Sequence, residues 1–210
     1  QIISPLAGDM TYYSEPFKSP EKLGFILSPM IFVDDNLSIV APTSEDASEL
    51  FALVDDNRQY LRKWLPWLDS NVSVNDELDF IEISRKDRLQ GSSGVWLIKE
   101  NNILIGSISI NWIDWDNKSC GLGYWLSEDK TGNGIVTRCC HSMIENLIFN
   151  NKIHRFVIEV AINNYSSRKV AESLGMRLEG IIKDRELLYG EYVDAALYAI
   201  TAPEWNLRKA

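Results

Sequence analysis

Residues 131–137, with the sequence TGNGIVT, place two glycines one residue apart before an apolar run that could begin a helix. Gly132 and Gly134 lack a Cβ atom, so main-chain N–H groups beside them can approach a ligand closely. The start of a helix adds N–H groups without intrahelical partners and a partial positive charge. These features predict an anion-binding loop, and phosphate is its expected anion.

Two familiar phosphate-binding motifs do not fit this spacing. A Walker A loop needs a glycine, four residues and then Gly-Lys-Ser or Gly-Lys-Thr, and the chain has no such run. A dinucleotide-binding fingerprint needs a third glycine where Thr137 stands, and it opens a parallel sheet instead of following a meander of strands. The loop therefore indicates another class of phosphate ligand.

The composition is that of a globular protein with an acidic surface. Of its 210 residues, 45% are hydrophobic and 24% are charged, and the formal net charge is −9. This charge disfavours a nucleic-acid partner and favours a cationic peptide or amine, although a merely solvated acidic surface is the alternative. No apolar run approaches the roughly 20 residues needed to cross a bilayer. No secretory signal is visible, so we expect a cytoplasmic protein without a membrane partner.

The three cysteines do not suit a disulfide framework, because their number is odd and two are adjacent. Cys139, Cys140 and His141 could suggest a metal, but consecutive residues of a helix point in different directions. We therefore expect structural cysteines in a reducing cytosol and no metal site.

The first 29 residues contain four prolines and no clear periodicity, which predicts an N-terminal arm or a cloning remnant over residues 1–29. A single domain is expected over residues 30–210. Its first part should contain a strand over 37–42 and a helix capped by Thr43 and Asp46. A short helix that ends in an aromatic loop at 60–69 and a longer helix over 75–89 follow.

The second half predicts an antiparallel meander and then a strand–helix–strand unit whose two strands are parallel. The fold class is therefore α/β with a mixed sheet. The expected elements are strands over 94–100, 103–113 and 119–127, a helix over 135–149, a strand over 155–162, a helix over 166–174, and two final strands that turn at Gly190.

Two segments together resemble a known family. "YWLSEDKTGNGIVT" and, some thirty residues later, "NNYSSRKVAESLGMRLEG" resemble the signature segments of the GNAT superfamily of acetyltransferases, and more closely its RimJ/RimL branch, which acetylates protein N-termini, including those of ribosomal proteins. The likeness extends from about residue 37 to 206 and includes "DNRQYLRKWLPWLD". It implies a mixed, mostly antiparallel twisted sheet flanked by helices, with a central βαβ unit that binds acetyl-CoA.

The resemblance also implies which residues hold the cofactor. In that family the loop binds the pyrophosphate of acetyl-CoA through main-chain amides, and the preceding strand pairs with the pantetheine arm. Thr131 and Val136 depart from the family pattern, so weaker cofactor affinity is expected. Carried over, the amides are those of Gly132, Asn133, Gly134, Ile135, Val136 and Thr137, and the strand residues are Trp125 and Leu126.

The family's Asn-x-x-Ser matches Asn164 and Ser167, which are also ordinary helix-capping residues. The tyrosine that often protonates the departing thiolate is replaced by Ala171, so the resemblance passes that role to Ser167. Glu186 matches a glutamate proposed as general base in RimL-like enzymes, and an exposed strand glutamate is the alternative. Because an α-amine has a pKa of about 7.7 to 8.0, one carboxylate suffices as base.

Trp64 and Trp67 flank Pro66 in the variable early part of the chain, so they are candidates for the acceptor pocket, with a core role as the alternative. The sequence thus predicts an acetyl-CoA-dependent N-acetyltransferase for a protein or peptide N-terminus. The alternatives are a GNAT enzyme for a small amine, such as a polyamine or aminoglycoside, and a catalytically weak acyl-CoA-binding module. A homodimer is expected from RimL-like relatives, and the acceptor stays open.

Overall fold

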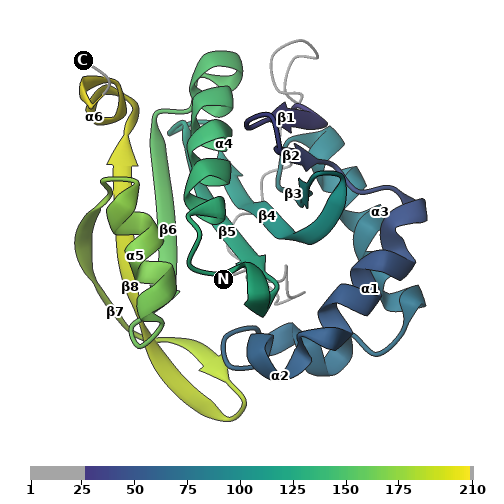
Figure 1. Cartoon of the computed structure of the whole chain (residues 1–210). Helices are drawn as coiled ribbons and strands as arrows, with labels where there is room; N and C mark the ends of the chain where they lie inside the picture. The colour runs from purple at the N-terminus through teal and green to yellow at the C-terminus, as the bar shows by residue number, and fades with distance from the viewer. Residues whose placement is uncertain (1–26, 209–210) are drawn as a thin grey trace, which may run out of the picture.

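Eight strands form one sheet in the order β1-β2-β3-β4-β5-β6-β8-β7 (Figure 1). In the computed structural model, which describes residues 27–208, β5 and β6 are parallel and every other neighbouring pair is antiparallel. The predicted mixed, mostly antiparallel sheet is therefore confirmed. The strands are β1 Met30–Phe32, β2 Leu37–Val40, β3 Gly94–Glu100, β4 Ile103–Asp114, β5 Ser119–Leu126, β6 Arg155–Ala161, β7 Arg177–Leu188 and β8 Glu191–Thr201.

Some of the helices begin where the sequence offers side-chain caps. Thr43 and Asp46 form the predicted capping box at the turn before α1, and Ser73 with Asp76 forms another at the start of α3. Within residues 27–208, no helix is long and apolar enough to cross a membrane. The helices are α1 Ala47–Asp56, α2 Arg58–Leu61, α3 Val74–Gln90, α4 Ile135–Asn151, α5 Tyr165–Ser173 and α6 Ala202–Leu207, with short 3-10 turns η1 Ser44–Asp46, η2 Pro66–Ser70 and η3 Glu128–Lys130.

Hydrophobic side chains cover both faces of the sheet, because alternate residues of a strand point to opposite sides. Trp96 and Tyr124 belong to the larger cluster, which includes residues of α4 and α5. Leu97 and Trp125, their neighbours in sequence, belong to the smaller cluster with residues of α1, α2 and α3. Two helical layers therefore enclose the central strands.

The predicted βαβ unit consists of β5, α4 and β6, and α4 runs beside both strands in Figure 1. The parallel ladder contains only three residue pairs and ends at Gly121 and Val157, although both strands continue. Beyond that point β5 and β6 separate. An opening in the middle of the sheet results, next to the glycine loop.

Two elements were not predicted. The short β1 pairs with β2, and α6 follows β8. The start of α6 has a readable signal, because Thr201 and Glu204 form a capping box with Pro203 in the first turn. Residues 1–26 of the predicted arm lie outside the described residues, and the domain boundary at residue 30 stays a prediction. Leu27 is already buried in the larger cluster.

Candidate active site

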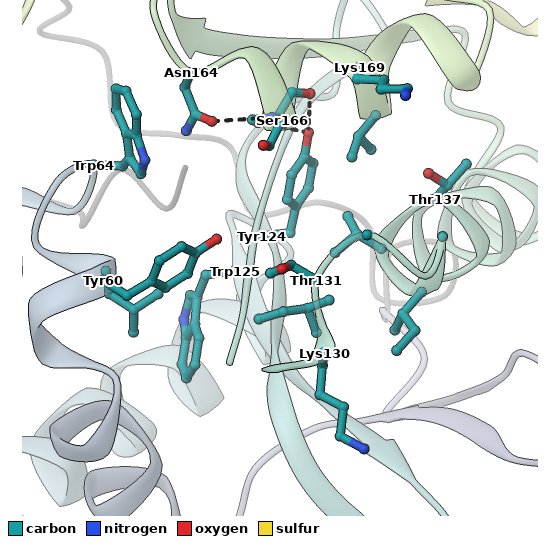
Figure 2. Close-up of a pocket in the computed structure, with 18 of the residues that line it drawn as sticks. Tyr60, Trp64, Tyr124, Trp125, Lys130, Thr131, Thr137, Asn164, Ser166 and Lys169 are labelled. Atoms are coloured by element: carbon teal, nitrogen blue, oxygen red, sulfur yellow. Dashed lines mark hydrogen bonds between the residues drawn. The ribbon is translucent and has the colours of Figure 1, made fainter. Parts of the chain in front are cut away.

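A cavity of about 550 Å³ lies where the β5–β6 ladder ends (Figure 2). Three parts of the chain line it: the end of β5 with the glycine loop, the first turns of α5, and α2 with the residues that follow it. The glycine loop and α5 belong to one side of the sheet and α2 to the other. The cavity thus connects the two faces of the sheet through the gap between β5 and β6.

The glycine loop is open to a ligand. Gly132 has φ +81° and Gly134 has φ +69°, a left-handed backbone that favours glycine, and a Cβ atom at either residue would meet nothing within 4 Å. Gly134 precedes α4, and no side chain in the described chain caps that helix start. The first N–H groups of α4, from Ile135 to Thr137, therefore face the cavity as donors for an anion.

The basic residues near the loop differ in their availability. Lys130 forms an ion pair with Glu100 at 2.8 Å, and Arg138 forms one with Asp34 at 2.5 Å. Lys169, on α5, lines the cavity, and no ion pair holds it within the part of the chain that the structure describes. Lys169 is therefore the basic side chain best placed to meet an anion bound at the loop, and the sequence motifs did not single it out.

Tyr124, Ser167 and Asn164 form a hydrogen-bonded group on the α5 side of the cavity (Figure 2). The Asn164 Oδ1 atom accepts a hydrogen bond from Ser167 N at 3.2 Å, which is the predicted cap of α5. The Tyr124 hydroxyl lies 3.0 Å from both the carbonyl oxygen and the Oγ atom of Ser167. Burial raises the pKa of Tyr124, so this phenol stays protonated.

The two predicted acceptor-site tryptophans lie in different places. Trp64 lines the 550 Å³ cavity together with Tyr60 from α2, and Figure 2 shows both on the left of the view, across from Thr131 and Thr137. Trp67 instead lines a second cavity, of about 330 Å³, on the α1–α3 face. Trp125 lines both cavities, so they meet at one indole ring.

Glu186 lies on β7, opposite Val193 of β8, and is partly buried. The end of this hairpin reaches the region of α2 (Figure 1). There the Tyr189 hydroxyl donates to the main-chain oxygen of Leu65 at 2.6 Å, and the Arg62 guanidinium lies 3.8 Å from the centre of the Tyr189 ring. Glu186 is not among the residues that line the 550 Å³ cavity.

The other predicted cofactor residues, except Asn133, line the 550 Å³ cavity. All three cysteines are free and buried, and burial raises the pKa of the Cys139 thiol to about 12. Within residues 27–208, no group of three or more His, Cys, Asp or Glu side chains is placed to hold a metal ion.

The family model described as the acetyltransferase (GNAT) domain matches residues 36–177. The chain belongs to the GNAT acetyltransferase family. The similarity of this chain to several relatives covers nearly the whole length of those proteins. The ribosomal-protein-serine acetyltransferase of Escherichia coli K12 is 30% identical over 173 residues, which cover 82% of this chain and 97% of that protein.

Solved structures agree in fold. The microcin C7 self-immunity acetyltransferase MccE, in complex with acetyl-CoA and AMP, has a TM-score of 0.80 and 30% identity, covering 84% of this chain and 98% of its own. RimL, the ribosomal L7/L12 alpha-N-protein acetyltransferase, in complex with coenzyme A, has a TM-score of 0.80 and 29% identity, covering 82% of this chain and 97% of its own. This GNAT acetyltransferase is therefore an acyltransferase whose acetyl donor is acetyl-CoA.

Acetyl-CoA fits the site through the chemistry of its walls. The open glycine loop and the start of α4 match a pyrophosphate, and the gap beside Leu126 matches an extended arm that enters between two strands. Tyr124, like Lys169, is a residue of this site that sequence reasoning missed. Its neighbours in β5 were identified through the family pattern, but no sequence signal indicates that its hydroxyl meets Ser167 across 43 residues.

Proposed function

We propose that this enzyme transfers the acetyl group of acetyl-CoA to the α-amine of a protein N-terminus, as ribosomal-protein acetyltransferases do, and that it acts in the cytoplasm. The single observation that carries the proposal is the cavity that passes through the sheet, with the phosphate-binding loop on one side and an aromatic wall from α2 on the other. Donor and acceptor can therefore approach the same point from opposite faces.

The leaving group of this reaction is the thiolate of coenzyme A, which needs a proton. Ser167 is the proposed donor, because its hydroxyl belongs to the cavity and its position is fixed by two neighbours. When Tyr124 donates its hydrogen to Ser167 Oγ, the Ser167 hydroxyl hydrogen is free to point at the thiolate. Tyr124 is thus the proposed positioning residue. Ser167 gives its proton to the thiolate and regains one from water, so the proton that the acceptor amine releases balances the one that coenzyme A takes up.

The acceptor must lose a proton to attack the thioester. Glu186 is the proposed general base. It belongs to the β7–β8 hairpin, and the hydrogen bond from Tyr189 of that hairpin to Leu65 supports the proposal, because Leu65 lines the acceptor side of the cavity. Because Glu186 does not line the cavity, we propose that it acts through one water molecule. An α-amine with a pKa of about 8 requires no stronger base.

The acceptor side of the cavity and the charge of the whole chain also support the proposal. Trp64 and Tyr60 give the acceptor a largely apolar wall, which suits the first residues of an extended peptide. The net charge of −9 favours basic substrates such as ribosomal proteins, by attraction over the whole surface.

A thiol-release assay with acetyl-CoA tests this function against its alternatives. The acceptors are peptides with free α-amines, matched peptides with blocked α-amines, and small amines including spermidine and an aminoglycoside. We expect release of coenzyme A with the free peptides only. Turnover with small amines alone would favour a small-molecule enzyme, and acetyl-CoA binding without any turnover would favour a binding module.

A further inference from the structure

The second cavity, of about 330 Å³, lies on the α1–α3 face of the sheet behind Trp125. Trp125 and its cross-strand partner Ser107 form part of its floor, and Trp67 and Phe80 contribute aromatic walls. Its volume falls at the lower end of the range of about 300–1,000 Å³ that is typical of ligand sites. Because Trp125 also lines the 550 Å³ cavity, a molecule bound in the second cavity lies one side chain away from the 550 Å³ cavity.

Three buried polar atoms around this cavity lack hydrogen-bond partners within residues 27–208: Trp67 Nε1, Asn71 Oδ1 and Ser107 Oγ. Asn71 is only 8% exposed and Ser107 only 2%. An unpaired buried polar atom destabilises a fold, and native proteins contain few of them. Two of them, Asn71 Oδ1 and Ser107 Oγ, can accept hydrogen bonds, and their place around one cavity points to a ligand that donates to them.

A buried carboxyl group lies among these atoms. Glu77, on α3, is 2% exposed, and its Oε1 atom accepts a hydrogen bond from Asn71 Nδ2 at 2.7 Å. Burial raises the pKa of Glu77, because the ionised form has lost its water shell. A cation that entered the cavity would restore a favourable partner for that ionised form.

The charges around the cavity select against anions. Among the residues that the structure describes, none of those lining the cavity is basic, whereas Asp76 and Asp79 lie at its edge with Glu77 inside. Arg58 is close to Glu77, but its guanidinium donates to the main-chain oxygens of Leu68 and Asn71. A phosphate or carboxylate would therefore meet three acidic side chains and no basic one among the described residues of this cavity.

A primary ammonium group matches this environment. Its three N–H donors correspond to three acceptors, the Glu77 carboxylate, Asn71 Oδ1 and Ser107 Oγ, and a cation is also attracted by aromatic rings such as those of Trp67 and Phe80. We propose that this cavity binds an ammonium group that the acceptor carries besides the amine that is acetylated, namely a lysine side chain near the acceptor's N-terminus. This inference rests on the proposed function, which it deepens.

The first test is independent of acetyl transfer. n-Butylammonium chloride, an analogue of the lysine side chain, is titrated into the protein while its melting temperature is followed, with sodium chloride at equal ionic strength and 1-butanol as controls. We expect saturable stabilisation of the wild type by butylammonium alone. Glu77→Gln should weaken this binding by roughly 10- to 100-fold, because it removes a hydrogen bond to a charged group.

Glu82→Gln is the matched control, since it removes the same charge from an exposed glutamate of the same helix, paired with Arg85. It should bind butylammonium as the wild type does. Ser107→Ala is a second test variant, for use if Glu77→Gln does not fold. It removes one unpaired acceptor and should weaken butylammonium binding. Absence of saturable stabilisation, or equal binding by the Glu77→Gln and Glu82→Gln variants, would overturn the proposal.

The second test compares kcat/KM for peptides that differ only in lysine or norleucine at position 2, 3 or 4. At one position the lysine peptide should be preferred through a lower KM, and Glu77→Gln should abolish this preference while Glu82→Gln preserves it. Equal kcat/KM for lysine and norleucine at all three positions would overturn the lysine assignment. Faster turnover of 1,5-diaminopentane than of every peptide would also overturn the lysine assignment.

The two proposals can fail separately. If no peptide is acetylated, the proposed function is wrong, and butylammonium binding by the wild type but not by Glu77→Gln still supports an ammonium site. If peptides are acetylated without regard to lysine, the function stands and the inference about the second cavity is wrong.

Discussion

Replacing Tyr124 by phenylalanine removes one hydroxyl from the buried group at the start of α5. That hydroxyl lies 3.0 Å from both Ser167 O and Ser167 Oγ. The hydroxyl has a single hydrogen, so its loss removes about one donated hydrogen bond, at about 0.5–1.5 kcal/mol of stability. For a chain of this size the melting temperature should then fall by about 1 to 6 °C.

The catalytic effect should be larger than the structural effect. If Tyr124 positions the Ser167 hydroxyl, its loss should lower kcat by about 10²-fold, as displaced catalytic groups do. Ser167→Ala should lower kcat by about 10²- to 10⁴-fold. The double variant should be no slower than Ser167→Ala alone, because both changes disable the same proton transfer.

Single-turnover measurements at saturating acetyl-CoA provide the assay, with cofactor affinity measured by calorimetry on each variant. Tyr198→Phe is the control, because the Tyr198 hydroxyl also forms hydrogen bonds within the fold, accepting from Arg168 and donating to Glu172, and Tyr198 does not line the cavity. It should lose stability and keep kcat. Losses of kcat that multiply in the double variant, or a Tyr124→Phe enzyme with normal kcat, would refute the positioning role.

Four further outcomes are expected. Gly134→Asn, which tolerates φ +69°, should preserve the fold and weaken acetyl-CoA binding about tenfold by calorimetry, and unchanged affinity would exclude the loop as the phosphate site. Glu186→Gln should lower kcat at pH 7 by about 10²- to 10⁴-fold, with the loss shrinking above the acceptor pKa of about 8, and near-normal kcat at pH 7 would remove the base assignment. Trp64→Ala should raise the acceptor KM without changing acetyl-CoA affinity, whereas a stability loss of about 3–5 kcal/mol with normal KM would indicate a core residue. Glu77→Gln should stabilise the fold at neutral pH. The folded-state pKa of Glu77 is raised above 4.5, so the ionised carboxylate of Glu77 does not destabilise the wild type below that pH. The destabilisation grows as the pH rises through the folded-state pKa, and the glutamine variant escapes it. Urea unfolding at pH 4 and pH 7 measures the difference, and a variant less stable than the wild type at pH 7 would contradict it.

Local features of the sequence predicted most of the fold. The capping box of Thr43 and Asp46, the glycine at 175 that follows α5, and the apolar runs of β3 to β5 with turn residues between them each depend on residues close together in the chain. The phosphate loop was predictable for the same reason, because Gly132 and Gly134 require their left-handed backbone locally. β1 was missed because three residues carry too little pattern.

The arrangement of the site depends on contacts between distant elements, which one sequence does not display. The pair Tyr124 and Ser167 is separated by 43 residues. Trp64 and Trp67 look equivalent in sequence, yet Trp64 precedes Pro66 and faces the larger cavity, whereas Trp67 belongs to the 3-10 turn and faces the smaller one. Glu77 resembles an ordinary glutamate of a helix's first turn, and only the packing of α3 on the sheet makes it buried.

The most direct test of the central claim is to locate the acetyl group on a reacted peptide. A peptide with a free α-amine and one lysine is incubated with enzyme and acetyl-CoA, and fragment-ion mass spectrometry identifies the modified nitrogen. We predict one acetyl group, on the α-amine, and no reaction when that amine is blocked. Acetylation of the lysine ε-amine alone, or of spermidine but no peptide, would contradict it.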